Sequence, residues 1–351
     1  MSPRAGSPTA CSRNSTRARP RTSRSPPSAC SNRRDRERSG PAARAAATGG
    51  RTMTPRLVPA ALLGAALALP AQADWRGQYR ELGFGVIPVE TQTEATASFR
   101  EFIPYASEKL GVPVKLFTAS DFIGVNNALI ARQIHFAWTS PSAMAGSILE
   151  CGCVEPIVTA TDKDGNLGYN SVLIVRADSP YRTLEDLKGR TVARTEPNSQ
   201  SGFLVPTVEF AKRGTPVDRY FVSPLSGGHT QSVLGVLNGT YDAAFTWTTK
   251  GDGYGQIRTM IDKGMLKRDQ IRVVWESAVV PAPPIIVHKD TPAALKAELV
   301  RFFTGLHRDR PDLARAVAHG ETQGFVPIDL SYYESTIEAR RMLRDARRRG
   351  G

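Results

Sequence analysis

Short apolar runs alternate with amphipathic stretches along almost all of residues 74–351, and this alternation limits the folds available to the chain. Short apolar runs are typical of buried strands, and apolar residues spaced three or four apart are typical of helices. The strand-like runs are 82–87, 112–117, 136–139, 156–160, 171–175, 191–193, 220–222, 243–246, 271–275 and 284–287. The helix-like stretches are 94–110, 122–132, 142–149, 203–213, 231–237, 292–306 and the tail 330–349. The pattern predicts α/β layering around mostly parallel sheets.

The length of this region favours two lobes over one domain. Residues 74–351 number 278, which is generous for a single hydrophobic core. Extended segments near 169–176 and 281–287 are candidate crossings between lobes. Because two crossings make one lobe an insertion in the other, we expect lobe 1 to comprise 74–170 and 284–351, and lobe 2 to comprise 171–283.

Residues 1–73 read as two segments that precede the folded part. Residues 1–52 are rich in Arg, Ser, Pro and Ala with almost no aliphatic or aromatic residues, so they are predicted to be disordered. A secretory signal peptide is predicted over 53–73, with Arg56, an apolar run and an Ala-Gln-Ala exit. We therefore expect translation to start at Met53, cleavage before Asp74 and a periplasmic location, with 1–52 a misassigned upstream extension.

The formal net charge of +13 does not indicate a nucleic-acid-binding protein. Residues 1–73 hold thirteen Arg against two acidic residues, whereas residues 74–351 hold 33 basic and 31 acidic residues. The predicted globular part is therefore nearly neutral, and a field able to recruit nucleic acid is not supported.

Cysteine and histidine usage offers little support for a cofactor. Cys151 and Cys153 are the two cysteines beyond residue 73, and in an oxidising compartment they could form a small disulfide ring. The sequence does not decide whether they are bridged. The five His are scattered and no metal-ligand spacing recurs, so we expect neither a metal nor another cofactor.

The segment 196–206, EPNSQSGFLVP, is the most informative motif for function. Ser199, Gln200, Ser201 and Gly202 stand directly before a predicted helix, whose N-terminus presents unpaired N–H groups and a partial positive charge. The serine hydroxyls add donors suited to a tetrahedral oxyanion, and Gly202 removes a Cβ that would hinder close approach. The alternative is an ordinary helix cap at Asn198 or Ser199.

A histidine at the start of another helix-like stretch is a second candidate. His229 follows two glycines, and either of its ring nitrogens could donate to an anion. Taken alone, His229 is better explained as a capping or packing residue. Thr139, Ser140 and Ser142 in FAWTSPSAM (136–144) stand at another strand-to-helix junction, either as pocket donors or as N-cap residues.

Several ordered blocks resemble the phosphonate-binding periplasmic proteins, which are the solute receptors of phosphonate, phosphite and phosphate ABC transporters. The resemblance runs from about residue 83 to 333. The blocks are TEATASF (93–99), KLGVPV (109–114), SDFIG (120–124), FAWTSPSAM (136–144), DGNLGYNSVLIVRADSP (164–180), EPNSQSGFLVP (196–206), SGGHTQSVLGVLNGTYDAA (226–244) and VVPAPP (279–284). Any one block would be weak, but their order and spacing together are specific.

The resemblance implies a type II periplasmic-binding-protein fold, in which two α/β lobes close on a ligand held between them. It assigns the phosphonate oxygens to residues 199–202 and to His229, and it makes Tyr169 an aromatic residue that lines the pocket. It also implies delivery of the ligand to a permease in the inner membrane. Receptors of this size commonly work as monomers, so we expect a monomer.

Departures from the family pattern bear on the ligand. The aminoethylphosphonate-binding member has a tyrosine where this chain has Phe122, and two carboxylates where this chain has Thr249 and Pro283. A buried ammonium without those partners would be uncompensated, at a cost of several kcal/mol. We therefore expect phosphite, an alkylphosphonate or phosphate, with Phe122 and Thr249 in the pocket wall. Asp252 is close enough in sequence to replace one carboxylate.

Two other functions fit some of the same residues. The same receptor could present its ligand to a membrane histidine kinase, and the sequence does not separate this role from transport. A secreted hydrolase would use Ser199 or Ser201 with His229 and Asp242, but the chain has no G-x-S-x-G nucleophile elbow. We expect no enzymatic activity.

Overall fold

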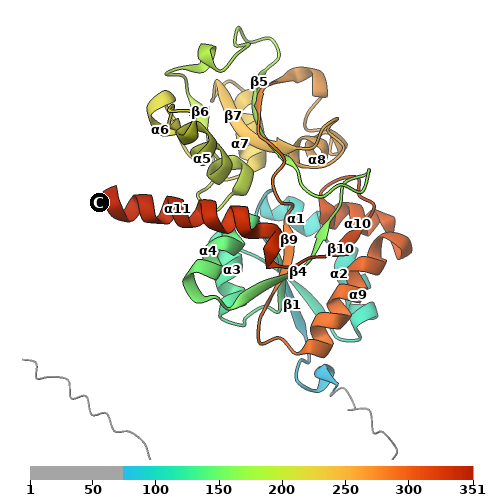
Figure 1. The fold of residues 1–351 in the computed structure, drawn as a ribbon. Helices are drawn as coiled ribbons and strands as arrows, with labels where there is room; N and C mark the ends of the chain where they lie inside the picture. The colour runs from blue at the N-terminus through green and yellow to red at the C-terminus, as the bar shows by residue number, and fades with distance from the viewer. Residues whose placement is uncertain (1–73, 351) are drawn as a thin grey trace, which may run out of the picture. The chain divides into compact units, whose positions relative to one another are not determined.

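The computed structural model describes residues 74–350. The predicted upstream extension and signal peptide lie outside the described residues. None of the helices between residues 74 and 350 is long and apolar enough to cross a membrane. The described elements group around two sheets (Figure 1).

The first sheet has six strands in the order β10-β4-β9-β3-β1-β2. Their bounds are β1 (Leu82–Val86), β2 (Val114–Thr118), β3 (Phe136–Trp138), β4 (Val154–Ala160), β9 (Pro284–His288) and β10 (Phe325–Pro327). Strand β1 pairs in parallel with β2 and β3, whereas β9 lies antiparallel between β3 and β4. We call this sheet and its helices the first lobe.

Helices cover the first sheet and enclose an aromatic core. They are α1 (Gln92–Ser98), α2 (Phe102–Leu110), α3 (Phe122–Ile130), α4 (Pro141–Cys151), α9 (Ala293–Asp309), α10 (Pro311–Ala318) and α11 (Glu334–Gly350), with 3₁₀ turns at Trp75–Gly77 and Leu330–Tyr333. Phe84 stacks on Phe136 at 4.8 Å between ring centroids, and Phe102 and Phe303 complete the cluster. Cys151 and Cys153 form a disulfide at the end of α4, which settles the pairing that the sequence left open.

The second sheet has four strands in the order β6-β7-β5-β8, and we call it and its helices the second lobe. The strands are β5 (Asn170–Arg176), β6 (Val192–Ala193), β7 (Ala243–Thr248) and β8 (Ile271–Glu276). The helices are α5 (Val205–Lys212), α6 (Val217–Tyr220), α7 (His229–Leu237) and α8 (Gln256–Asp262), with a π-helical turn η3 (Gln200–Leu204) and 3₁₀ turns at Glu185–Leu187 and Arg268–Gln270. Alternate residues of β5 enter separate apolar clusters, Leu173 in one and Val172 in the other, so both faces of the sheet are buried.

The expectation of mostly parallel sheets was wrong. Only the pairings β1–β2, β1–β3 and β6–β7 are parallel among those of the described strands. The chain's path explains this result. Strands β5 and β9 each enter a sheet from the other lobe, and therefore run opposite to strands such as β3 and β7 that lead toward the junction.

Two of the predicted elements differ in the structure. The helix expected over 94–110 is divided into α1 and α2, because Pro104 is tolerated in the first turn of a helix but not in its interior. The strand expected over 220–222 is absent, and Val222 makes only an isolated bridge to Thr191. Tyr220 instead ends the short helix α6.

The two segments that link the lobes are paired with each other. Tyr169 and Val280 form an antiparallel bridge with backbone N–O distances of 3.0 and 2.8 Å. Next to this bridge, the side-chain Nδ2 of Asn170 donates to the Ser277 carbonyl at 2.9 Å. The bridge places Tyr169 at the junction of the lobes, where its side chain is 3% exposed.

Candidate functional site

Ser199 caps the π-helical turn that precedes α5. Its Oγ accepts a hydrogen bond from the Gly202 amide at 3.1 Å, and its carbonyl accepts one from the Leu204 amide at 3.0 Å. The amides of Gln200 and Ser201 precede the first intrahelical donor, so helix geometry leaves them without a backbone acceptor in the turn. Ser199 and Ser201 are both almost fully buried. The predicted cap is therefore present, and it brings two hydroxyls and two amides to one buried turn.

The role expected for Gly202 needs correction. A Cβ at this residue would lie 2.0 Å from Thr195 Oγ1, so the space is filled by the protein's own side chain. Thr195 also holds the turn through its amide, which donates to the Gly202 carbonyl at 3.1 Å. Glycine is required here by packing against Thr195 rather than by the approach of an anion.

His229 lies directly beside the Ser199 cap. It is the first residue of α7, and its Nε2 is 3.2 Å from Ser199 Oγ while its Nδ1 is 3.3 Å from Thr246 Oγ1 on β7. Burial, aided by the nearby His319, lowers the pKa of His229 to about 3. The imidazole is therefore neutral near pH 7, with one N–H donor and one acceptor nitrogen.

Tyr169 and Tyr254 both pack against Trp247. The Tyr169 ring is 5.0 Å and the Tyr254 ring 5.3 Å from the Trp247 ring, both edge to face. Burial raises the pKa of Tyr169, partly offset by its contact with the Ser201 side chain. Tyr169 thus lies beside Ser201 of the capped turn, and its role as a pocket residue stays a prediction. Trp247 was missed in the sequence because strand β7 reads as ordinary core.

The first lobe contributes the start of α4. Ser140 caps this helix by accepting from the Ala143 amide at 3.0 Å, and its hydroxyl donates to the Asn198 carbonyl of the second lobe at 2.6 Å. Thr139 faces away from this contact, because its hydroxyl donates to Asn126 Oδ1 at 2.7 Å inside the first lobe. Ser142 Oγ is buried and has no protein partner in the described structure.

Three other predicted residues make contacts with groups other than the Ser199–His229 pair. The Gln200 side chain donates to Thr336 of α11 at 3.0 Å. Gln200 therefore has only its backbone N–H to offer at the turn. Phe122 is 1% exposed within the apolar core of the first lobe. Thr249 is buried, and its amide donates to the Tyr254 carbonyl at 3.0 Å.

A second buried histidine was missed in the sequence. His319 follows α10, and its Nδ1 is 3.4 Å from Glu90 Oε1 while its ring lies 4.4 Å from that of Trp138. Lys263 of the second lobe pairs with the same carboxylate at 2.6 Å. Burial tends to raise the pKa of Glu90, but hydrogen bonds and charge from His319 and Lys263 outweigh it and hold the pKa at about 2.

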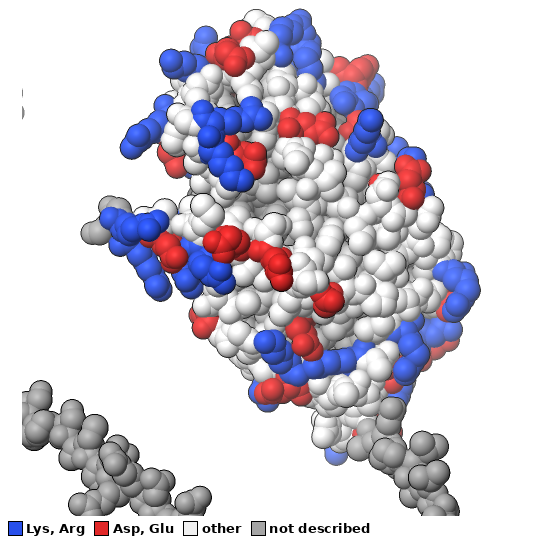
Figure 2. All heavy atoms as spheres, in the orientation of Figure 1, with Lys and Arg blue, Asp and Glu red and all other residues white. Residues whose placement is uncertain are grey.

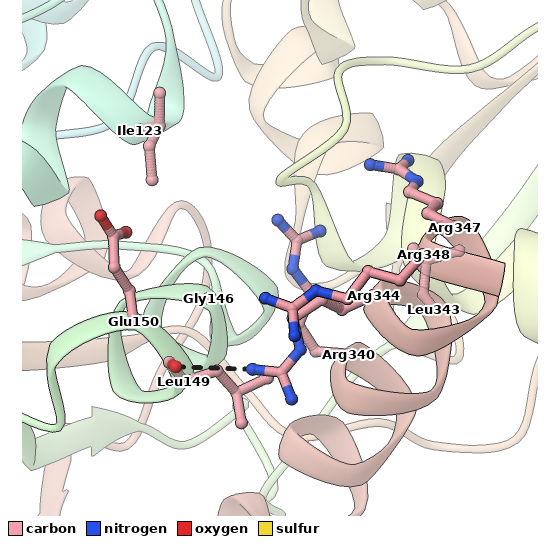
Figure 3. Close-up of a pocket in the computed structure, with 9 residues that line it drawn as sticks. All are labelled: Ile123, Gly146, Leu149, Glu150, Arg340, Leu343, Arg344, Arg347 and Arg348. Atoms are coloured by element: carbon pink, nitrogen blue, oxygen red, sulfur yellow. Dashed lines mark hydrogen bonds between the residues drawn. The ribbon is translucent and has the colours of Figure 1, made fainter. Parts of the chain in front are cut away.

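A separate surface pocket of about 420 Å³ lies between α4 and α11 (Figure 3). Four arginines of α11 line it together with apolar residues and one carboxylate: Arg340, Arg344, Arg347, Arg348, Ile123, Gly146, Leu149, Leu343 and Glu150. None of the predicted site residues is in its lining. Acidic and basic side chains are interspersed over the face drawn in Figure 2, and residues 74–350 contain no cluster of three His, Cys, Asp or Glu suited to a metal.

Two α/β lobes with buried polar groups at their junction define a solute-binding protein with the type II periplasmic-binding fold. The chain belongs to the family of periplasmic substrate-binding proteins of phosphonate ABC transporters, whose family description matches residues 84–333. It is 32% identical to the phosphonates-binding periplasmic protein of Escherichia coli, over 68% of this chain and 69% of that protein. It is also 32% identical to the phosphate-import protein PhnD of Mycolicibacterium smegmatis, over 60% of this chain and 67% of that protein.

Solved structures support the fold. A binding-protein component of an ABC phosphonate transporter from Pseudomonas aeruginosa is 25% identical with a TM-score of 0.65, covering 74% of this chain and 85% of that one. PhnD1 of Prochlorococcus marinus in complex with methylphosphonate is 18% identical with a TM-score of 0.62, covering 76% and 98%. The aliphatic sulphonate binding protein SsuA of Escherichia coli shares the fold at 12% identity and a TM-score of 0.53, covering 77% and 93%.

Proposed function

We propose that this protein captures a phosphorus oxyanion between its lobes and delivers it to an ABC permease. The observation that carries the proposal is the contact of Ser199 Oγ with His229 Nε2 at the start of the π-helical turn. There, the free amides of Gln200 and Ser201 add N–H donors, and the turn's dipole favours negative charge. The hydroxyl of Ser201, and Tyr169 at the junction of the lobes, complete the proposed donor set.

The neutral state of His229 determines what Ser199 offers to a ligand. Ser199 Oγ already accepts from the Gly202 amide. If Nε2 of His229 carries the proton, it donates to Ser199 Oγ, and Nδ1 accepts from the Thr246 hydroxyl. Both acceptor positions of Ser199 are then used, so its own O–H is free to donate to an anion. The opposite tautomer would draw that proton back to His229, so we assign the Nε2–H form.

The ligand is proposed to lack an ammonium group. Asp252, the candidate replacement for a missing carboxylate, is bound to Arg268 and accepts from Thr248 Oγ1 at 2.9 Å. The Pro283 carbonyl accepts from Thr159 Oγ1 at 2.9 Å. An aminoalkylphosphonate would therefore bury its cation without a carboxylate at either position, at a cost of several kcal/mol. Phosphite, methylphosphonate and phosphate avoid this penalty.

Binding without catalysis is proposed, although Ser199 and His229 are placed as a nucleophile and base would be. His229 Nδ1 faces the Thr246 hydroxyl rather than a carboxylate. Asp242 accepts from the Thr191 amide and the Tyr181 hydroxyl, both at 2.9 Å, and serves to hold β7 in place. The triad considered in the sequence is therefore not assembled, and we expect no turnover of a chromogenic ester.

Export through the segment 53–73 is part of the proposal. The family's periplasmic location calls for a targeting signal, and the motif ending at Ala73 provides one. Protein recovered from the periplasm of an expressing cell should begin at Asp74 by intact-mass measurement, and should run as a monomer in light scattering. A periplasmic product that retains residues before Asp74 would contradict the predicted cleavage.

Isothermal titration calorimetry tests the proposed ligand class. The panel is phosphite, methylphosphonate, phosphate, 2-aminoethylphosphonate and sulfate. We expect tight binding of at least one of the first three and weak binding of 2-aminoethylphosphonate. Preference for 2-aminoethylphosphonate would contradict the argument from Thr249 and Pro283, and silence toward all five would reject a phosphorus oxyanion.

A further inference from the structure

His319 adopts a backbone conformation that most residues avoid. It is the C-cap of α10 with φ +61°, in the left-handed region where Gly or Asn is usual. Histidine enters this region more readily than bulky residues do, yet it is not the preferred choice for a cap. A histidine in this conformation is a candidate for a role beyond ending the helix.

The backbone of His319 ties the first lobe to the second. Its carbonyl accepts from the Gly255 amide at 3.0 Å and from Thr259 Oγ1 at 3.2 Å, both in the second lobe. The side chain is 4% exposed. His319 therefore lies at the junction of the lobes, as the Ser199–His229 pair does.

One ring nitrogen of His319 is committed and the other is not. Nδ1 faces Glu90 Oε1 at 3.4 Å, and an ionised carboxylate can only accept, so Nδ1 carries the proton in that contact. Nε2 is buried and has no protein partner in the described structure. Buried polar atoms are seldom left unpaired, so Nε2 is open to a partner from outside the chain.

The surroundings of His319 connect it with the candidate site. Its ring lies 6.5 Å from that of Trp247, which in turn lies 6.4 Å from the His229 ring and 5.0 Å from the Tyr169 ring. Glu90 is the carboxylate paired with His319, and Lys263 pairs with the same carboxylate. Asp262, Asp312 and Arg315 line the same cavity as His319. The two histidines thus approach the same aromatic group from different lobes.

We propose that Nε2 of His319 accepts a hydrogen bond from the acidic hydroxyl of a singly protonated phosphorus oxyanion. The inference rests on the proposed function. With Nδ1–H donated to Glu90, and with Lys263 already paired to that carboxylate, the proposal gives His319 a lone pair at Nε2, which can pair only with a donor. The oxygens of the same ligand face the Ser199 hydroxyl and the amides of the turn, which can only donate to them.

This arrangement gives a basis for choosing phosphorus over sulfur. A methanesulfonate ion has the tetrahedral shape and negative charge of a methylphosphonate monoanion but no acidic hydroxyl. It would leave Nε2 of His319 facing an oxygen lone pair, and a buried acceptor without a donor is destabilising. The fold does not itself discriminate, since SsuA shares it. His319 is therefore the residue to which we assign the discrimination.

Calorimetry with methylphosphonate and methanesulfonate tests this assignment through two substitutions. His319→Asn keeps an amide near the Nδ1 position for Glu90, suits the left-handed backbone, and removes the Nε2 acceptor. His319→Gln places an amide oxygen near the Nε2 position. His288→Asn, at the end of strand β9, is the matched control. Melting temperatures of all variants identify any that fail to fold.

We expect His319→Asn to weaken methylphosphonate binding roughly tenfold or more, as for one lost hydrogen bond to a charged group. Methanesulfonate binding should change less, so the ratio of the two affinities falls, and His319→Gln should restore part of it. An unchanged ratio in folded His319→Asn, with tight methylphosphonate binding by the wild type, would overturn the role of His319 alone. A wild type that binds no phosphorus oxyanion would overturn the proposed function and this inference with it.

Discussion

Arg340 of helix α11 donates from Nη2 to Asn198 Oδ1 at 2.5 Å, and from Nη1 to the neighbouring Pro197 carbonyl at 2.8 Å. These acceptors belong to the second lobe and directly precede the Ser199 cap. Ser140 of the first lobe adds a bond to the Asn198 carbonyl at 2.6 Å. The first lobe therefore holds the segment that positions Ser199. Because these bonds cross between the lobes, the geometry of the candidate anion site depends on how closely the lobes approach each other.

Arg340→Ala should weaken oxyanion binding by roughly tenfold, because two hydrogen bonds that favour the closed arrangement are lost. Small-angle scattering at saturating ligand should report a larger radius of gyration than for the wild type. Arg349→Ala is the matched control, since Arg349 lies exposed on the same helix and does not line the arginine pocket. Equal effects of the two substitutions would mean that loss of positive charge, rather than the contact with Asn198, is responsible.

Ser199→Ala should reduce oxyanion affinity roughly 10- to 100-fold, because a hydroxyl donor to a charged group is removed. The loss of the cap should also lower the free energy of unfolding by about 1 kcal/mol. Calorimetry and urea unfolding measure the two effects separately. Ser331→Ala, at an exposed 3₁₀ turn, should change neither binding nor stability by a comparable amount. Wild-type affinity in Ser199→Ala would remove Ser199 from the site.

Glu196 should make the protein less stable as the pH rises toward neutrality. Burial raises the pKa of this carboxyl to about 7 from an ordinary value of 4.5. Between those two pH values the native protein holds a proton that the unfolded chain releases, so the free energy of unfolding falls as pH increases. Glu196→Gln should remove this dependence and gain on the order of 3 kcal/mol relative to the wild type above pH 7. Urea unfolding at pH 5 and pH 8 measures the difference, and parallel pH profiles for the two proteins would contradict the raised pKa.

Glu90 should have the opposite effect in acid. Its pKa of about 2 lies below the ordinary 4.5, so the unfolded chain binds the proton first and stability is lost as pH falls from about 4.5 toward 2. Glu90→Gln should therefore cost about 3 kcal/mol near pH 7, and the difference from the wild type should shrink in acid. A difference that stays constant with pH would show that Glu90 contributes through packing alone.

The features that could be predicted are those that depend on residues close together in the sequence. Strand β1, the helix start at Ser199 and the position of His229 follow from local apolar patterns, caps and glycines. The direction of β9 could not be predicted, since a run of apolar residues is the same in parallel and antiparallel pairs. The role of His319 depends on Glu90 and Trp247, which meet it only in the folded chain. The space beside Gly202 was assigned to a ligand for the same reason, because nothing local shows that Thr195 fills it.

The central claim is that the anion binds at Ser199 and the π-helical turn. A crystal structure from crystals grown with methylphosphonate tests it most directly. We predict that the phosphonate oxygens lie within hydrogen-bonding distance of Ser199 Oγ and of the Ser201 amide, with His229 Nε2 donating to Ser199. An anion bound instead in the pocket of Arg340, Arg344 and Arg347, with nothing at the π-helical turn, would contradict the account.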